Sequence, residues 1–285
     1  MFEKVIVGYA SDQAGRDALA FARQLLGTLG GRLTLVFPYH PLMARDPAEK
    51  VETRVREEAL AQLRGVELAP PVCHWTSSWP IRGLHKMASY EGADLIVIGA
   101  AQEHHADPRR LSLMERMVHA APCAVAVAPP GYAQRVPSPI RRIGVGCSED
   151  EQSSAAVRVA DRLAKEMAAG LELIAGAGIS LEAIGYPGSL PSPPKIEDEP
   201  YDEAQRLLDR FAQGLRAQAR LTVLRTDPVR ALVERSEQLD LLVLGSRGYG
   251  PVGHVLLGSV SAEVMRSARC PVLVMPCGAS APAIA

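Results

Sequence analysis

The chain has 285 residues, which is enough for two domains that each bury a core of ordinary size. Its 31 Lys and Arg residues balance 32 Asp and Glu residues to a formal net charge of -1, so we expect no nucleic-acid partner. No apolar run approaches the roughly 18 residues of a membrane helix, no basic and apolar leader opens the chain, and the five Cys residues form no C-x-x-C pair. We therefore expect a cytoplasmic protein with reduced thiols and no membrane partner.

Short β-branched runs alternate with amphipathic helical patterns along the first half of the chain. Strands are expected at 4–8, 32–37, 72–75, 94–99 and 123–128, and helices at 12–29, 47–64, 81–90 and 111–120. Strands that alternate with helices in this way predict a parallel sheet covered on both faces.

A Pro-rich stretch follows, and after it the same order begins again. Strands are expected at 142–146, 171–175 and 221–224, helices at 150–167, 201–218 and 229–238, and a surface loop at the Pro-rich segment 185–200. The segment 240–276 then supplies a strand, a glycine-rich loop, a helix start and a last apolar run. We place one domain at 1–130, a linker at 131–140, a second domain at 141–279 and a tail at 280–285.

Short motifs recur in the same order in the two halves. The offset between them is 138 residues for Val7-Gly8 and Val145-Gly146, 146 residues for Asp94 and Asp240, and 147 residues for Cys123 and Cys270. Because the offset is nearly constant along the chain, the sequence indicates a tandem duplication.

The segment 240–276 holds the clearest candidate site, with the spacing Gly245-x2-Gly248-x9-Gly258-Ser259. Ligands of open parallel sheets lie beyond the carboxyl ends of the strands, where this loop is expected. Gly245 and Gly248 would let a ligand approach the backbone, and Arg247 would supply a cation. The helix start at 258–260 would offer N–H groups to an anion. Together these features predict a polyphosphate cradle.

Ordinary turn chemistry is the alternative interpretation of the same residues. Any tight connection from a strand to a helix uses glycine, and Ser259 could be a simple N-cap. The sharper nucleotide loops, G-x-x-x-x-G-K-[ST] and a G-x-G-x-x-G after the first strand, are absent from the sequence. His104, His105 and Asp107 could suggest a metal site, but adjacent His side chains seldom converge, so we expect no metal site. No spacing indicates a catalytic residue.

The run from Gly245 to Pro276 resembles the C-terminal signature of the universal stress protein family, whose ATP-binding members carry Gly-x2-Gly-x9-Gly-Ser/Thr. The strand motifs of both halves match the family too, so the resemblance covers nearly the whole chain. It implies an α/β fold of two tandem Rossmann-like (adenine nucleotide alpha hydrolase-like) sandwiches, each with a five-stranded parallel sheet. It also implies a pseudo-dimer in which the last strands, 124–128 and 272–275, pair with each other.

The resemblance further implies ATP or a related adenine nucleotide as the ligand, with or without Mg²⁺. The phosphates and ribose would lie on the glycine motif, and the adenine near the ends of the first two strands of the second half. The full candidate set is Gly146, Cys147, Ser148, Gly176, Gly245, Arg247, Gly248, Gly258, Ser259 and Val260.

Two departures from the family pattern matter. ATP-binding members usually carry an Asp just after the first strand, where this chain has Ser148 in the second half and Ala10 in the first. The first half also has Gln102 where the second half has Gly248, and Leu111-Ser112-Leu113 where it has the 258–260 helix start. We therefore predict a stress-response protein that binds a nucleotide in its second half only, with a degenerate first half as its structural partner.

We predict no dedicated catalytic activity and at most slow ATP hydrolysis, because no general base or Walker-type lysine is evident. A nucleotide-independent interaction module, with both sites decayed, is the alternative function. A related hydrolase or nucleotidyl transferase is a less favoured third. Association of two chains into a homodimer stays open.

Overall fold

The computed structural model describes residues 1–38, 48–65, 71–76, 80–100, 113–135, 139–178, 198–246 and 258–275. Several predicted features lie outside these ranges: Arg247 and Gly248, the segment 101–112 with its two His residues, most of the Pro-rich segment 185–200, and the tail. Within the described part, no helix is long and apolar enough to cross a membrane.

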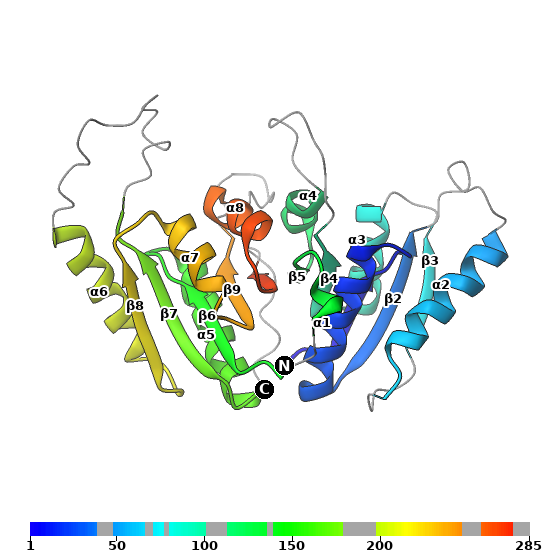
Figure 1. Cartoon of the computed structure of the whole chain (residues 1–285), viewed down its shortest axis with the longest axis horizontal. Helices are drawn as coiled ribbons and strands as arrows, with labels where there is room; N and C mark the ends of the chain where they lie inside the picture. Colours follow the sequence, from blue (N-terminus) through cyan, green and yellow to red (C-terminus); the bar gives the residue numbers. More distant parts are fainter. Residues whose placement is uncertain are drawn as a thin grey trace, which may run out of the picture.

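The first half follows the predicted alternation of strands and helices (Figure 1). Its elements are β1 (Lys4–Gly8), α1 (Gln13–Leu29), β2 (Arg32–Pro38), α2 (Ala48–Gln62), β3 (Val72–Thr76), α3 (Pro80–Glu91), β4 (Leu95–Gly99), α4 (Leu113–Ala120) and β5 (Ala124–Ala128).

The second half repeats this order after a short 3-10 helix, η1 (Tyr132–Gln134). Its elements are β6 (Arg142–Gly146), α5 (Glu151–Glu166), β7 (Gly170–Gly176), α6 (Asp198–Ala212), β8 (Ala219–Leu224), α7 (Pro228–Ser236), β9 (Leu241–Gly245), α8 (Ser259–Ser267) and β10 (Val272–Met275). The α/β fold predicted from the sequence is therefore confirmed.

The strands form one sheet in the order β3-β2-β1-β4-β5-β10-β9-β6-β7-β8. Within each half the strands run parallel, whereas β5 and β10 pair antiparallel, with Val127 opposite Val272 and Val125 opposite Val274. Because β5 and β10 are the last strands of the two halves, the halves meet edge to edge at this ladder (Figure 1). The mirrored strand order places β1 and β6 in the middle of their own halves, where the strand order along the chain changes direction.

Two apolar clusters cover the two faces of the sheet and continue from one half into the other. One cluster contains buried side chains from α1, α2, α5 and α6, and the other contains side chains from α3, α4, α7 and α8. Aspartates cap several of these helices: Asp12 accepts from Gly15 N at 2.7 Å in front of α1, and Asp150 accepts from Ser153 N at 2.7 Å in front of α5. The apolar faces of the helices are thus buried against the sheet, and the starts of α1 and α5 are capped by side chains.

Helix α6 differs from the sequence prediction at both ends. It begins at Asp198, so the last residues of the segment 185–200 are helical rather than part of a loop. It ends at Ala212 instead of continuing to 218. The buried carboxylate of Asp161 on α5 accepts hydrogen bonds from the amides of Arg216 and Ala217, at 3.2 Å and 2.9 Å, and so holds these residues in a bend after the helix.

The segment predicted as a linker, 131–140, is packed against the first half where it begins. Gly131 has a positive φ of 76°, and the fully buried Asp17 of α1 accepts hydrogen bonds from the amides of Gly131 and Ala133, at 2.8 Å and 2.7 Å. At its other end, Ile140 is buried in the core. The connection between the halves is therefore anchored on both sides.

Candidate functional site

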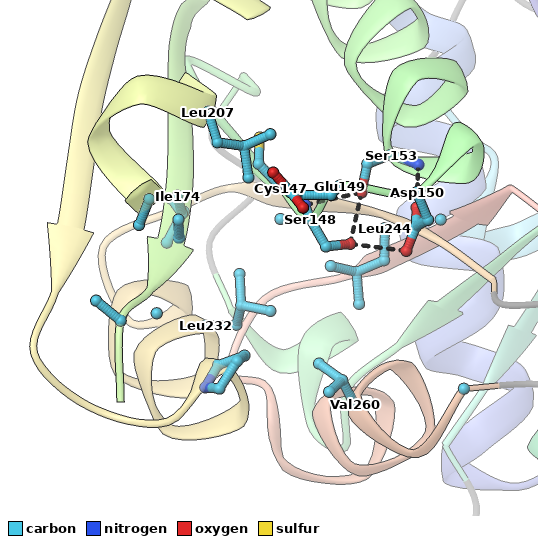
Figure 2. A pocket seen from close by; sticks show the side chains of 18 of the residues that line it. Cys147, Ser148, Glu149, Asp150, Ser153, Ile174, Leu207, Leu232, Leu244 and Val260 are labelled. Carbon is cyan, nitrogen blue, oxygen red and sulfur yellow. Dashed lines mark hydrogen bonds between the residues drawn. The ribbon is translucent and has the colours of Figure 1, made fainter. Parts of the chain in front are cut away.

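A cavity of about 380 Å³ lies at the carboxyl ends of β6, β7 and β9 in the second half. Helices α6 and α7 close it on one side, and the first turn of α8 closes it on another (Figure 2). Its position next to the central strand β6 is the place where open parallel sheets bind ligands. Its volume falls within the range of small-molecule pockets, about 300–1,000 Å³.

Every predicted site residue that the structure describes lines this cavity: Gly146, Cys147, Ser148, Gly176, Gly245, Gly258, Ser259 and Val260. They come from four separate segments of the chain, which only the parallel topology brings together. Arg247 and Gly248 lie outside the described residues.

The start of α8 differs from the starts of α1, α5 and α7. Those three helices have an aspartate N-cap whose carboxylate accepts a backbone N–H, whereas the N-cap of α8 is Gly258, with no hydrogen bond from a capping side chain. Ser261 fixes this turn to the sheet, because its hydroxyl donates to the carbonyl of Gly245 at 2.8 Å. Within the described part of the chain, the first-turn N–H groups of α8 thus face the cavity without a capping side chain, an arrangement that suits an anion.

A hydrogen-bonded group forms another part of the cavity wall. The hydroxyl of Ser148 donates to Asp150 Oδ2 at 2.8 Å and lies 2.9 Å from Ser153 Oγ, which also accepts from Ser148 N at 2.9 Å (Figure 2). Asp150 Oδ1 accepts from Ser153 N at the start of α5. The carboxylate of Asp150, two residues beyond Ser148, therefore lies at the cavity despite the missing Asp at position 148.

The sequence prediction did not include Asp150 and Ser153, nor Glu203, Ala204 and Leu207 of α6. A signal existed for Asp150, because an N-cap aspartate four residues after the end of β6 keeps its carboxylate at the helix start, near the strand ends. Nothing in the local sequence indicated which face of α6 would cover the cavity, because that depends on tertiary packing.

Charge is distributed unevenly around the cavity. The described lining includes the carboxylates of Glu149, Asp150 and Glu203 but no Lys, Arg or His side chain. Glu149 is exposed and pairs with Arg210 at 3.0 Å. An anionic group of a ligand is therefore disfavoured at the α5 and α6 side and favoured at the α8 side.

The family model for universal stress proteins matches residues 1–129 and 139–276. The chain belongs to the universal stress protein family. The two matched ranges correspond to the two halves of the sheet, so this is a tandem universal stress protein, as the sequence predicted.

Individual relatives agree with this assignment. A universal stress protein of Thermus aquaticus is 37% identical over 30% of this chain and 70% of its own length. Universal stress protein Rv2623 of Mycobacterium tuberculosis is 50% identical over 52 residues, and the aligned part spans only 18% of that protein's length. A universal stress protein structure from Archaeoglobus fulgidus covers 95% of this chain and 97% of its own, with a TM-score of 0.58 and 18% identity, which shows a shared fold.

Two glycines that line the cavity of this universal stress protein are needed for close packing of the helices against the strand ends. A Cβ on Gly245 would lie 2.7 Å from the backbone carbon of Gln152 at the start of α5, and a Cβ on Gly176 would lie 2.7 Å from Pro228 Cα. Side chains at these positions would push helices away from the strand ends. Part of the glycine pattern therefore serves close helix packing, whatever ligand the cavity takes.

The equivalent positions in the first half carry buried aromatic rings. By the 138-residue offset and the strand registers, Tyr9 corresponds to Cys147 and Phe37 to Ala175. The two rings meet edge to face, with centroids 5.8 Å apart, and the Tyr9 hydroxyl accepts from Gln62 Nε2 at 3.1 Å. Side chains of this size occupy the strand ends where the second half has smaller ones.

Cys147 lines the cavity as a neutral thiol. Burial raises the pKa of this thiol to about 12, so the reactive thiolate is scarce at neutral pH. Burial likewise raises the pKa values of Cys123 and Cys270 to about 12. The thiol of Cys147 therefore contributes apolar surface to the cavity wall rather than nucleophilic chemistry.

Proposed function

We propose that this tandem universal stress protein binds ATP or a related adenine nucleotide in its second half and uses the nucleotide as a regulatory ligand. The observation that carries the proposal is the cavity at the ends of β6, β7 and β9, which gathers all the described residues of the predicted nucleotide motif. Family membership supports the same function, since the glycine motif resembles that of ATP-binding members.

The cavity favours one orientation of the nucleotide. The phosphates would lie at the first turn of α8, where the N-cap is Gly258 and no described side chain caps the amide groups. The base and sugar would lie toward Ser148 and Gly176, away from the phosphates, because carboxylates line that side. Arg247, predicted from the sequence as a cation beside the phosphates, comes two residues after the end of β9 in the sequence and would complete the anion site, with or without Mg²⁺.

We propose one nucleotide site per chain. In the first half, Tyr9 and Phe37 are fully buried at the positions of Cys147 and Ala175, so two aromatic rings stand where a base would enter. The first half would then act as the structural partner of the second, through the antiparallel β5–β10 ladder.

We propose that the nucleotide is a ligand and not a substrate in rapid turnover. The residues at the described phosphate end are Gly258, Ser259, Val260 and Ser261, none of which has a carboxylate or imidazole to activate water.

The described cysteines are free thiols, which fits the reducing cytoplasm as the place of action.

The decisive measurement is a calorimetric titration of the full chain with ATP, which we expect to give one site per chain. Gly258→Asp should weaken ATP binding by tenfold or more, because a carboxylate would face the phosphates at close range (about 1.4 kcal/mol per tenfold). Gly258 has φ -65° and ψ 148°, which Asp adopts readily, and Asp is a favoured N-cap. The variant should therefore stay folded.

The matched control is Gly214→Asp, at an exposed glycine whose added Cβ would meet only Phe211 O at 3.7 Å. This variant should bind ATP as the unaltered chain does. A chain that shows no heat and no thermal stabilisation with millimolar ATP would contradict the proposal and favour the nucleotide-independent interaction module. Two sites per chain would contradict the proposed asymmetry, and fast metal-dependent turnover would favour an enzyme.

A further inference from the structure

The group formed by Ser148, Asp150 and Ser153 fixes the direction of its own hydrogen bonds. The carboxylate of Asp150 can only accept, so the hydroxyl proton of Ser148 must point to Asp150 Oδ2, 2.8 Å away. The 2.9 Å contact between the two serine oxygens then requires Ser153 to donate to Ser148. Each hydroxyl proton of the group is thereby used inside the group.

What remains available to a ligand is therefore acceptor capacity alone. Ser148 Oγ keeps one lone pair, and its residue is only partly buried at the cavity, whereas Ser153 is buried. The carboxylates of Glu149 and Glu203 line the same side of the cavity. Figure 2 shows Ser148 and Asp150 close together above Leu244, on a different side of the cavity from Val260 of α8.

The first half provides an internal comparison for this group. Asp12 caps α1 through Gly15 N at 2.7 Å, just as Asp150 caps α5 through Ser153 N at 2.7 Å. By the 138-residue offset, however, Ala10 stands at the position of Ser148 and Gly15 at the position of Ser153. The first half therefore forms the same strand-to-helix turn without either serine, so neither serine is required for the turn.

We propose that Ser148, held by Asp150 and Ser153, is a specificity-determining residue that selects a ligand hydrogen-bond donor. The proposal rests on nucleotide binding at this cavity and adds to it which chemical group is recognised there. A sugar hydroxyl or the exocyclic amine of a base supplies such a donor. A group that only accepts, such as a base carbonyl or a phosphate oxygen, would face acceptors and lose its hydration without compensation.

The test compares ATP, 2′-deoxy-ATP, 3′-deoxy-ATP and inosine triphosphate by calorimetry on the full chain and on Ser148→Ala. We expect one of the three analogues to bind the unaltered chain roughly tenfold or more weakly than ATP. Loss with a deoxy analogue identifies the hydroxyl at the missing position as the donor, and loss with inosine triphosphate identifies the amine. Ser148→Ala should weaken ATP binding by a similar factor and bind ATP and the discriminated analogue equally.

Ser148→Ala should fold normally, since the first half has alanine at this position, and Ser154→Ala on the same helix controls for serine loss outside the cavity wall. Equal binding of all four nucleotides, or unchanged discrimination in Ser148→Ala, would overturn the inference and leave nucleotide binding intact. Failure of ATP itself to bind the unaltered chain would overturn the proposed function and the inference together.

Discussion

Gly245 shows how one missing side chain sets the distance between a strand and a helix. Its Cα lies so near the start of α5 that a Cβ would come within 2.7 Å of the Gln152 backbone. In the first half, Gly99 at the end of β4 is closer still, since its Cβ would lie 1.9 Å from Ala14 O. Both halves thus need glycine here for packing, although only the second half has the glycine motif that follows.

We predict that Gly245→Ala lowers the free energy of unfolding by about 1–3 kcal/mol, because the helix start must move to admit the methyl group. Urea unfolding measures this change. Gly170→Ala is the matched control, since its Cβ would meet only Arg141 O at 3.7 Å on an exposed strand position, and it should be neutral. An unchanged urea midpoint in Gly245→Ala would show that this glycine is not needed for packing and serves ligand binding alone.

At the residue scale, the sequence predicted the positions of the candidate site better than its chemistry. Glycines after strands are visible in a pattern, so the sequence could pick out the described motif residues that line the cavity. The hydrogen-bonded group of Ser148, Asp150 and Ser153 was not predicted, because it depends on the carboxylate of Asp150 accepting from the Ser148 hydroxyl. That orientation comes from the helix cap, and the sequence pattern alone did not connect the cap with the cavity.

A hydrogen bond from a histidine of α3 to the backbone of α4 links the two helices, and the ionisation of this histidine should affect stability. His85 Nε2 lies 3.1 Å from the carbonyl of Met117, and burial lowers the pKa of His85 below its ordinary value of 6.5. The unfolded chain then binds a proton at this site more readily than the folded chain does. The stability from neutral His85 is present above pH 6.5 and is lost as the pH falls through the folded pKa.

We therefore predict that the urea midpoint of the chain falls between pH 7 and pH 5, and that His85→Gln reduces this fall. Glutamine can still donate to Met117 O but does not titrate in this range. His119→Gln, on the neighbouring helix, controls for the removal of an imidazole. The same pH dependence in the unaltered chain and in His85→Gln would show that other groups dominate.

At the element scale, most strands and helices were predictable because their apolar periodicity is strong. Helix α6 was the exception. It ends at Ala212, and the residues that were predicted to continue it are held outside the helix because Asp161 accepts from the amides of Arg216 and Ala217. These residues lie 55 and 56 positions from Asp161, so no local pattern could show where the helix would stop. The sequence likewise did not show that the start of the segment 131–140 packs against the first half, because the buried Asp17 that accepts from Gly131 N lies far away in the sequence, on α1.

The ladder between β5 and β10 makes the two halves share one sheet. Val274 is fully buried and lies opposite Val125 of the other half. The apolar clusters on both faces also continue across this ladder. We therefore expect the halves to unfold together, which the duplication in the sequence alone did not require.

We predict that Val274→Asp destabilises the chain by more than about 3 kcal/mol, because it buries a carboxylate in an apolar ladder. Both tryptophans, Trp75 and Trp79, belong to the first half, so their fluorescence reports that half. Although Val274 lies in the second half, Val274→Asp should shift the unfolding transition measured by tryptophan fluorescence by as much as the one measured by circular dichroism. Gln218→Asp, at an exposed position just before β8, should shift neither. Separate transitions would indicate halves that fold independently.

The anchored connection from Gly131 to Ile140 has a consequence for how such a protein can change over generations. In an assembly of two identical chains, every mutation is copied into both partners at once. Here each half has its own stretch of coding sequence, while a continuous backbone guarantees that the partners meet. One half can accumulate bulky substitutions such as Tyr9 and Phe37 while the other keeps an open cavity. Covalent linkage of the two halves thus allows them to differ in sequence and in role, which two identical chains of a homodimer cannot do.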